Sequence, residues 1–74
     1  MEDQRIKEIL IEKNQDFRQM YLKHQEYEKQ LREMDGSIVN TEAQLVEARK
    51  IKKQKLRLKD AMQKFIIEYR DMVQ

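Results

Sequence analysis

Glycine occurs once in this 74-residue chain, at Gly36, and proline does not occur at all. These two residues are the strongest breakers of regular structure, so the chain has one obvious place to turn. On each side of Gly36, apolar side chains recur at helical spacing over about thirty residues. The pattern predicts a single all-α domain over residues 1–74, built from two long helices that meet near Gly36.

In both halves the apolar residues alternate steps of four and three, as the a and d positions of a coiled coil do. The first seam comprises Ile6, Leu10, Lys13, Phe17, Met20, His24, Tyr27, Leu31 and Met34. The second comprises Gln44, Ala48, Ile51, Lys55, Leu58, Met62, Phe65, Tyr69 and Met72. We therefore expect a helix over about residues 3–34, a turn over about 35–40 and a helix over about 41–73. They should pack as an antiparallel two-helix hairpin.

Residues around the turn carry signals for the end of one helix and the start of the next. Gly36 can end the first helix in the left-handed conformation. Either Asn40 or Thr41 can cap the second helix, and Thr41 has Gln44 three residues later, which is the spacing of a capping box.

A reversal at Gly36 places residues whose numbers sum to about 75 opposite one another. Phe17 is then expected beside Leu58, and His24 beside Ile51. The open end of the hairpin becomes its most apolar part.

A second set of apolar residues lies off the seam, where a single hairpin leaves it uncovered. Its members are Ile9, Ile11, Leu22, Leu45, Leu56, Ile66, Ile67 and Val73. Small cores often need oligomerisation, so we expect a homodimer or higher homo-oligomer, in the form of a four-helix bundle. The expected interface residues are Ile9, Leu56, Ile66, Ile67 and Val73. The alternative is that scattered exposed apolar residues have no binding role.

One segment is strongly basic: seven of the eleven residues from Arg49 to Lys59 are Lys or Arg, and none is acidic. Such a face can bind phosphate backbones. The candidate polyanion-binding residues are Arg49, Lys50, Lys52, Lys53, Arg57 and Lys59. The alternative is a solvated face partly neutralised by Asp16, Glu26 and Glu28. No aromatic residue is interleaved to stack on bases, so nucleic-acid binding is the second interpretation.

His24 is the only histidine and occupies a seam position, where a polar residue usually sets register. Glu28, one turn later, could share a metal ion with His24, but two ligands are a weak signal and a structural role is favoured. Cysteine is absent, and neither a paired nucleophile and base nor a glycine-rich phosphate loop occurs. We expect no enzymatic activity, no cofactor and no metal site.

The longest apolar runs are the triplets at residues 9–11 and 65–67, against about 20 residues for a membrane-spanning helix. The first residues lack the basic and apolar stretches of a signal peptide. These observations predict a cytoplasmic protein without a membrane partner.

The run Lys52–Asp60, which reads KKQKLRLKD, together with Phe17, Lys23–His24 and Leu31, resembles the YdcH-like family of small bacterial proteins. The resemblance covers about residues 14–66. It implies a bacterial origin, a self-associating two-helix hairpin and no assigned activity. This chain extends the second helix beyond the shorter members.

Taken together, these features predict a non-enzymatic coiled-coil protein that acts through self-association or by docking to a helical protein. The alternative is a small nucleic-acid-associated protein that uses the basic face of residues 49–59.

Overall fold

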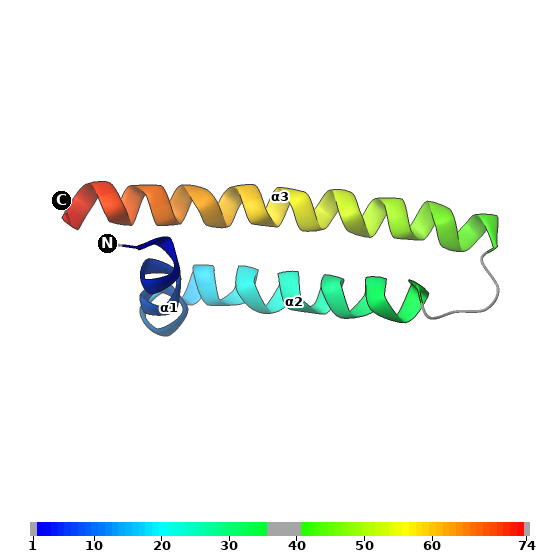
Figure 1. Cartoon of the computed structure of the whole chain (residues 1–74), viewed down its shortest axis with the longest axis horizontal. Coiled ribbons are helices and arrows are strands. Elements are labelled where there is room, and N and C mark those ends of the chain that lie inside the picture. Colours follow the sequence, from blue (N-terminus) through cyan, green and yellow to red (C-terminus); the bar gives the residue numbers. More distant parts are fainter. Residues whose placement is uncertain (1, 36–40, 74) are drawn as a thin grey trace.

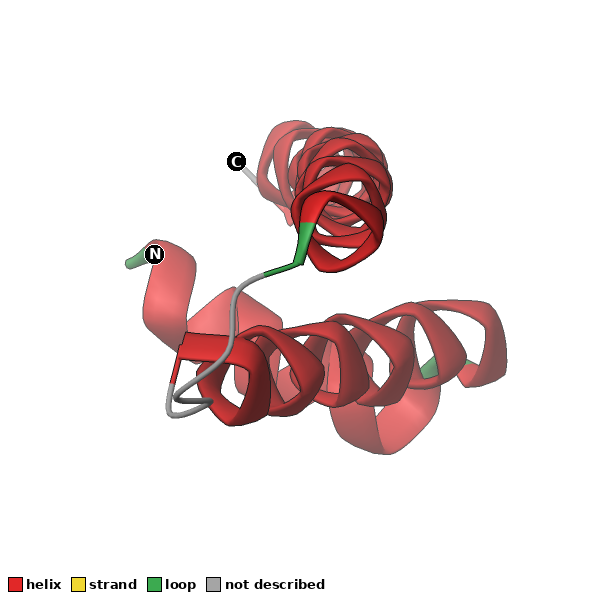
Figure 2. Ribbon diagram, turned by 90° about the vertical axis from the view of Figure 1, so that its right-hand side faces the viewer, coloured by secondary structure: helices red, strands yellow, loops and turns green. Residues whose placement is uncertain are grey.

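The structure is a computed structural model that describes residues 2–35 and 41–73. Its described part consists of three helices and no strand: α1 (Asp3–Lys13), α2 (Gln15–Asp35) and α3 (Glu42–Val73). The all-α prediction is confirmed. Helices α2 and α3 run side by side in opposite directions, and α1 crosses the pair at the end where α3 finishes (Figure 1). Figure 2 views α3 nearly end-on, with α2 below it.

The predicted helix over residues 3–34 is wrong at one position, because the chain breaks at Asn14. There the backbone is extended, with φ −116° and ψ 112°. The Asn14 N–H donates to the carbonyl of Leu10 at 2.8 Å, and the Asn14 side-chain oxygen accepts from the N–H of Phe17 at 3.0 Å. Asn14 therefore ends α1 and also caps α2, a role that suits asparagine.

Arg18, in the first turn of α2, reinforces this break. Its Nε donates to the carbonyl of Ile11 at 2.7 Å, and its Nη2 donates to the carbonyl of Glu12 at 2.5 Å. Carbonyls in the last turn of a helix have no partner within that helix. The guanidinium of Arg18 therefore satisfies the end of α1 and holds α1 at an angle to α2.

The core lies where the three helices meet. Its buried residues are Ile6, Leu10, Phe17, Met62 and Ile66. The prediction that the open end is the most apolar part is confirmed. Ile66 lies off the predicted seam, yet it is only 6% exposed because α1 covers that side of α3.

The predicted register of the two long helices is wrong by one heptad at Phe17. The Phe17 ring packs edge-on against Phe65, with centroids 6.0 Å apart and planes at 74°. The expected neighbour was Leu58, seven residues earlier in the sequence. A heptad repeat presents the same face every seven residues, so this shift keeps apolar side chains in contact.

The predicted capping box at the start of α3 is confirmed. The Gln44 N–H donates to Thr41 Oγ1 at 3.2 Å, and the Thr41 N–H donates to Gln44 Oε1 at 3.3 Å. Each residue thus satisfies a backbone donor that the helix leaves free. The turn at Gly36 and the alternative cap Asn40 lie outside the described residues.

Candidate functional site

The basic segment Arg49–Lys59 occupies the middle of α3, and helical spacing divides most of it into two rows. Lys52, Lys55 and Lys59 form the inner basic row, which lines a shallow hollow beside Leu31 of α2. The outer basic row consists of Lys50, Lys53 and Arg57. All six residues predicted to bind polyanions are exposed.

Neutralisation of the basic segment by α2 is limited to one pair. Lys55 Nζ lies 3.7 Å from Glu28 Oε1. Within residues 2–35 and 41–73, no other basic side chain of the segment forms an ion pair, and neither Asp16 nor Glu26 reaches it. The expectation of partial neutralisation therefore applies to Glu28 but fails for Asp16 and Glu26.

His24 lies between α2 and the inner basic row, with its side chain 17% exposed. Its Nδ1 is 3.4 Å from Glu28 Oε1, and its Nε2 is buried without a hydrogen-bond partner among the described residues. The imidazole pKa is lowered from 6.5, first by burial and then by Lys55, Lys7 and Lys59, while Glu28 opposes the change.

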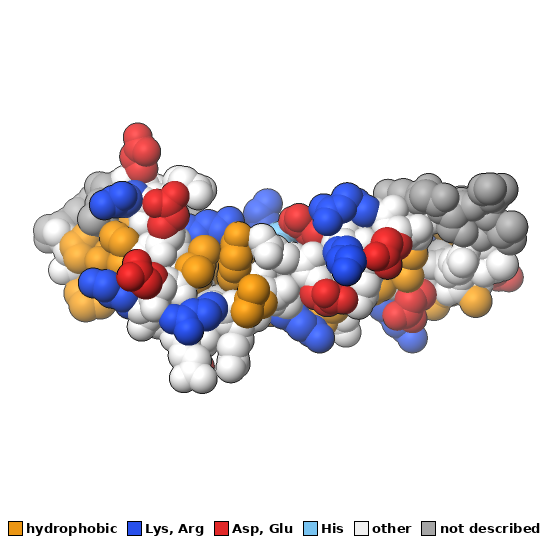
Figure 3. Space-filling view, turned by 90° about the horizontal axis from the view of Figure 1, so that it is seen from below, with side chains coloured by type: hydrophobic (Ala, Val, Ile, Leu, Met, Phe, Trp, Pro, Cys, Tyr) orange, Lys and Arg blue, Asp and Glu red, His pale blue; other side chains and the backbone are white. Residues whose placement is uncertain are grey.

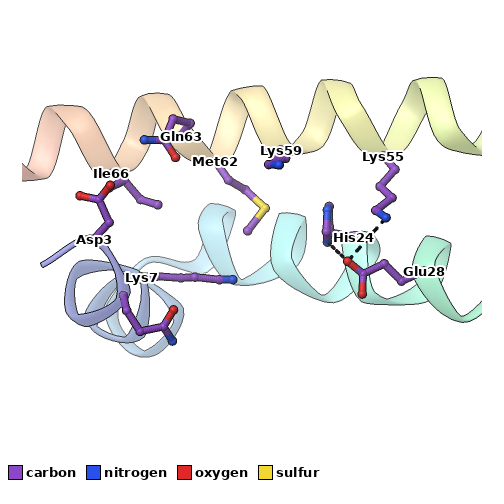
Figure 4. A pocket seen from close by; sticks show the side chains of 10 residues that line it. Asp3, Lys7, His24, Glu28, Lys55, Lys59, Met62, Gln63 and Ile66 are labelled. Carbon is purple, nitrogen blue, oxygen red and sulfur yellow. Dashed lines mark ion pairs between the residues drawn. The ribbon is translucent and has the colours of Figure 1, made fainter.

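A groove of about 410 Å³ opens beside His24, and all three helices line it. We call it the three-lysine groove. Its lining consists of Asp3, Gln4, Lys7, His24, Glu28, Lys55, Lys59, Met62, Gln63 and Ile66. Figure 4 shows Lys7 extending from α1 toward the space between α2 and α3, with Met62 reaching into that space from α3.

Ion pairs already occupy both acidic groups of this groove. Asp3 Oδ1 lies 3.0 Å from Arg70 Nη1, and Glu28 pairs with Lys55. Lys7 and Lys59 form no ion pair within the described ranges. The ammonium of Lys7 is held 5.3 Å from the centre of the Tyr21 ring. The groove therefore presents two cations without a partner carboxylate.

The five residues predicted for an oligomer interface occupy different environments. Leu56, Ile67 and Val73 are exposed on α3, and Ile9 is half-buried on α1. Ile66 belongs to the core, so the expectation that another chain must cover it is wrong. Helix α1, which the continuous-helix prediction had placed in line with α2, provides that cover.

Six of the seven large apolar side chains exposed in the described ranges lie on α3. Three of them, Leu45, Leu56 and Ile67, recur every eleven residues, which is close to three helical turns, and so lie along one side. Their side chains are 51%, 58% and 39% exposed. We call them the apolar row. On the outward face of α2, in contrast, acidic and basic side chains alternate (Figure 3).

Sequence reasoning missed the break at Asn14 and the contribution of Lys7. The first had a signal, because Asn14 is followed by Asp16, and an acid in the first turn after a capping residue is typical of a helix start. The uninterrupted heptad steps obscured it. The second had no signal, since Lys7 reaches the groove only because α1 crosses the helix pair.

Two kinds of site were also sought across the described part of the chain. Among these residues, no group of three or more His, Asp or Glu side chains is placed to hold a metal ion. None of the three helices combines the length and apolar character needed to cross a membrane. Comparison with family models, with curated proteins and with solved structures finds no match for this chain.

Proposed function

We propose that this chain is a non-enzymatic helical protein that acts through self-association or by docking to a helical protein. The observation behind this proposal is the apolar row of α3. Leu45, Leu56 and Ile67 are large exposed apolar side chains aligned along one side of the 32-residue helix α3, next to the side that packs on α2. Aligned apolar residues at helical spacing are the usual contact surface for a second helix.

Self-association is the simpler form of the proposal because the core of a single chain is small. Six apolar side chains are buried in the described ranges, and five of them form one cluster at the end where α1 crosses. A second copy packed along α3 would cover the apolar row and complete a four-helix arrangement of long helices. The resemblance to the YdcH-like family, which stays a prediction, agrees with this form.

Docking to another helical protein is supported by the charge of α3. This helix carries nine basic and five acidic residues, a net charge of +4, whereas α2 carries four and five, a net charge of −1. Arg49, Lys52 and Lys59 flank the apolar row on the same side of the helix. A partner helix with acidic residues beside an apolar stripe would complement it.

Light scattering at increasing salt separates the two forms. Two copies of a basic surface repel each other, so salt should leave the self-associated mass unchanged or increase it. An acidic partner helix, supplied as a designed amphipathic peptide, should instead lose affinity as salt rises. A mass near 9.2 kDa at tens of micromolar chain would remove the self-association form.

Substitutions then test the apolar row itself. Changing Leu56→Lys and Ile67→Lys together should shift the mass toward the monomer or abolish peptide binding. Val46→Lys is the matched control, since Val46 is 47% exposed on the same helix but lies outside the row. If the double variant kept the wild-type behaviour, the contact surface would lie elsewhere.

A second candidate function is binding to nucleic acid, and the exposure of the basic segment favours it. Six of its seven basic side chains have no ion pair within the described ranges, so they remain accessible to phosphates. Labelled duplex can be titrated at about 50 and about 150 mM salt with the wild type and with Lys50, Lys53 and Arg57 changed to Gln. Micromolar binding at the higher salt that is lost in this variant would support the function, and no binding at the lower salt would refute it.

A further inference from the structure

We propose that the three-lysine groove binds a phosphate group, held between Lys7 of α1 and Lys59 of α3. The groove differs from the two surfaces discussed above in that residues from all three helices line it. It shares Lys55 and Lys59 with the inner basic row, but none of its lining residues belongs to the apolar row or to the outer basic row.

The charges around the groove indicate what charge a ligand would need in order to match it. Asp3 and Glu28 are already paired with Arg70 and Lys55, which leaves the ammonium groups of Lys7 and Lys59 without carboxylate partners. A phosphate carries a charge of about −1.5 to −2 near neutral pH, which matches two cations. Lysine ammonium groups are common point-charge partners of phosphate.

The position of Lys7 strengthens the assignment. A free lysine side chain on a surface helix ordinarily extends into solvent, but the ammonium of Lys7 lies over the ring of Tyr21 and faces the groove (Figure 4). Three ammonium groups from two helices, those of Lys55, Lys7 and Lys59, are close enough to lower the pKa of His24. Glu28 already pairs with Lys55, so the ammonium groups of Lys7 and Lys59 are the two whose charge an anion in the groove would offset.

Beneath these cations the groove is apolar. Met62 and Ile66 are each 6% exposed and line the bottom of the groove, whereas Gln4 and Gln63 lie at its rim. The amide groups can donate to phosphate oxygens, and the apolar floor can contact the organic part of a phosphate monoester. Inorganic phosphate is the simplest probe for this site.

His24 provides a direct measurement because it is the only histidine of the chain. Its imidazole signal can be followed by NMR while phosphate, succinate or chloride is added at constant ionic strength. Phosphate between Lys7 and Lys59 offsets their positive charge, so it should raise the pKa of His24 in a saturable manner. Succinate, whose two charges are far apart, should have a weaker effect, and chloride little effect.

Matched variants separate a site from general attraction to a basic protein. The Lys7→Gln and Lys59→Gln double variant should lose phosphate affinity by about tenfold or more. Lys50→Gln with Lys53→Gln removes the same charge from the outer basic row and should change affinity by less than about twofold. Circular dichroism verifies that both variants stay helical.

Three results would overturn the proposal. Phosphate would move the His24 signal no further than chloride does, or succinate would act as strongly as phosphate. Alternatively, the two double variants would lose affinity equally, which would indicate attraction by net charge alone.

Discussion

The two ends of the α2–α3 pair share one heptad pattern but differ in how deeply their seam residues are buried. Where α1 crosses, Ile6 and Phe17 are fully buried within a five-residue cluster. Toward the other end, Ile51 is the one buried residue in the described ranges, and Tyr27, Leu31 and Met34 are half-buried. Two helices shield a seam from two sides only. A third helix covers more of these side chains, and this chain supplies one at a single end.

The largest expected effect comes from removing the centre of the three-helix end. Phe17→Ala should lower the free energy of unfolding by about 3–5 kcal/mol, since it leaves a cavity and removes the edge-on contact with Phe65. Leu31→Ala, in the two-helix part, should cost about 1 kcal/mol because Leu31 is only half-buried. Urea unfolding measures both. Equal losses would show that the two ends are equally well packed.

A smaller effect is expected from the helix caps. Asn14→Ala removes the acceptor for the Phe17 N–H and should destabilise the whole chain by about 0.5–2 kcal/mol. Thr41→Ala removes the acceptor for the Gln44 N–H at the less buried end, where the loss should appear as local fraying. Hydrogen exchange of the first amides of α3 measures this fraying. Faster exchange throughout the chain in Thr41→Ala would contradict the proposed difference between the ends.

The smallest expected effect is a pH dependence of the free energy of unfolding. It arises from His24, which lies between the two ends of the helix pair. Burial and the nearby Lys55, Lys7 and Lys59 lower its pKa below 6.5, with Glu28 opposing them. As pH falls, the unfolded chain therefore takes up this proton first, and the free energy of unfolding decreases from about pH 6.5 down to the folded-state pKa. Below that pKa the loss is complete.

Replacing His24 by Gln removes the titrating group and should remove this part of the pH dependence. Urea midpoints on both sides of the window measure it. An unchanged slope in His24→Gln would show that another group is responsible.

Much of the helical structure could be predicted from local sequence. The absence of proline, the single glycine and the heptad spacing predicted an all-α chain, and the Thr41 capping box marked the start of α3. The basic segment and the exposure of Leu56 and Ile67 likewise followed from their spacing along one helix. These features depend on residues within a few turns of one another, so the sequence contains the information directly.

Tertiary structure decided the register between the long helices, the break at Asn14 and the placement of α1. Heptad spacing is unchanged by a shift of seven residues, so it could not distinguish Phe65 from Leu58 as the partner of Phe17. The heptad spacing also continues without interruption through Asn14. The structure nevertheless breaks the helix there, because Asn14 caps α2 and Arg18 binds the carbonyl of Ile11 at the end of α1. The burial of Ile66 and the position of Lys7 in the same groove as Lys59 follow from that break. They depend on how three helices pack together, and periodicity within a single helix does not specify that.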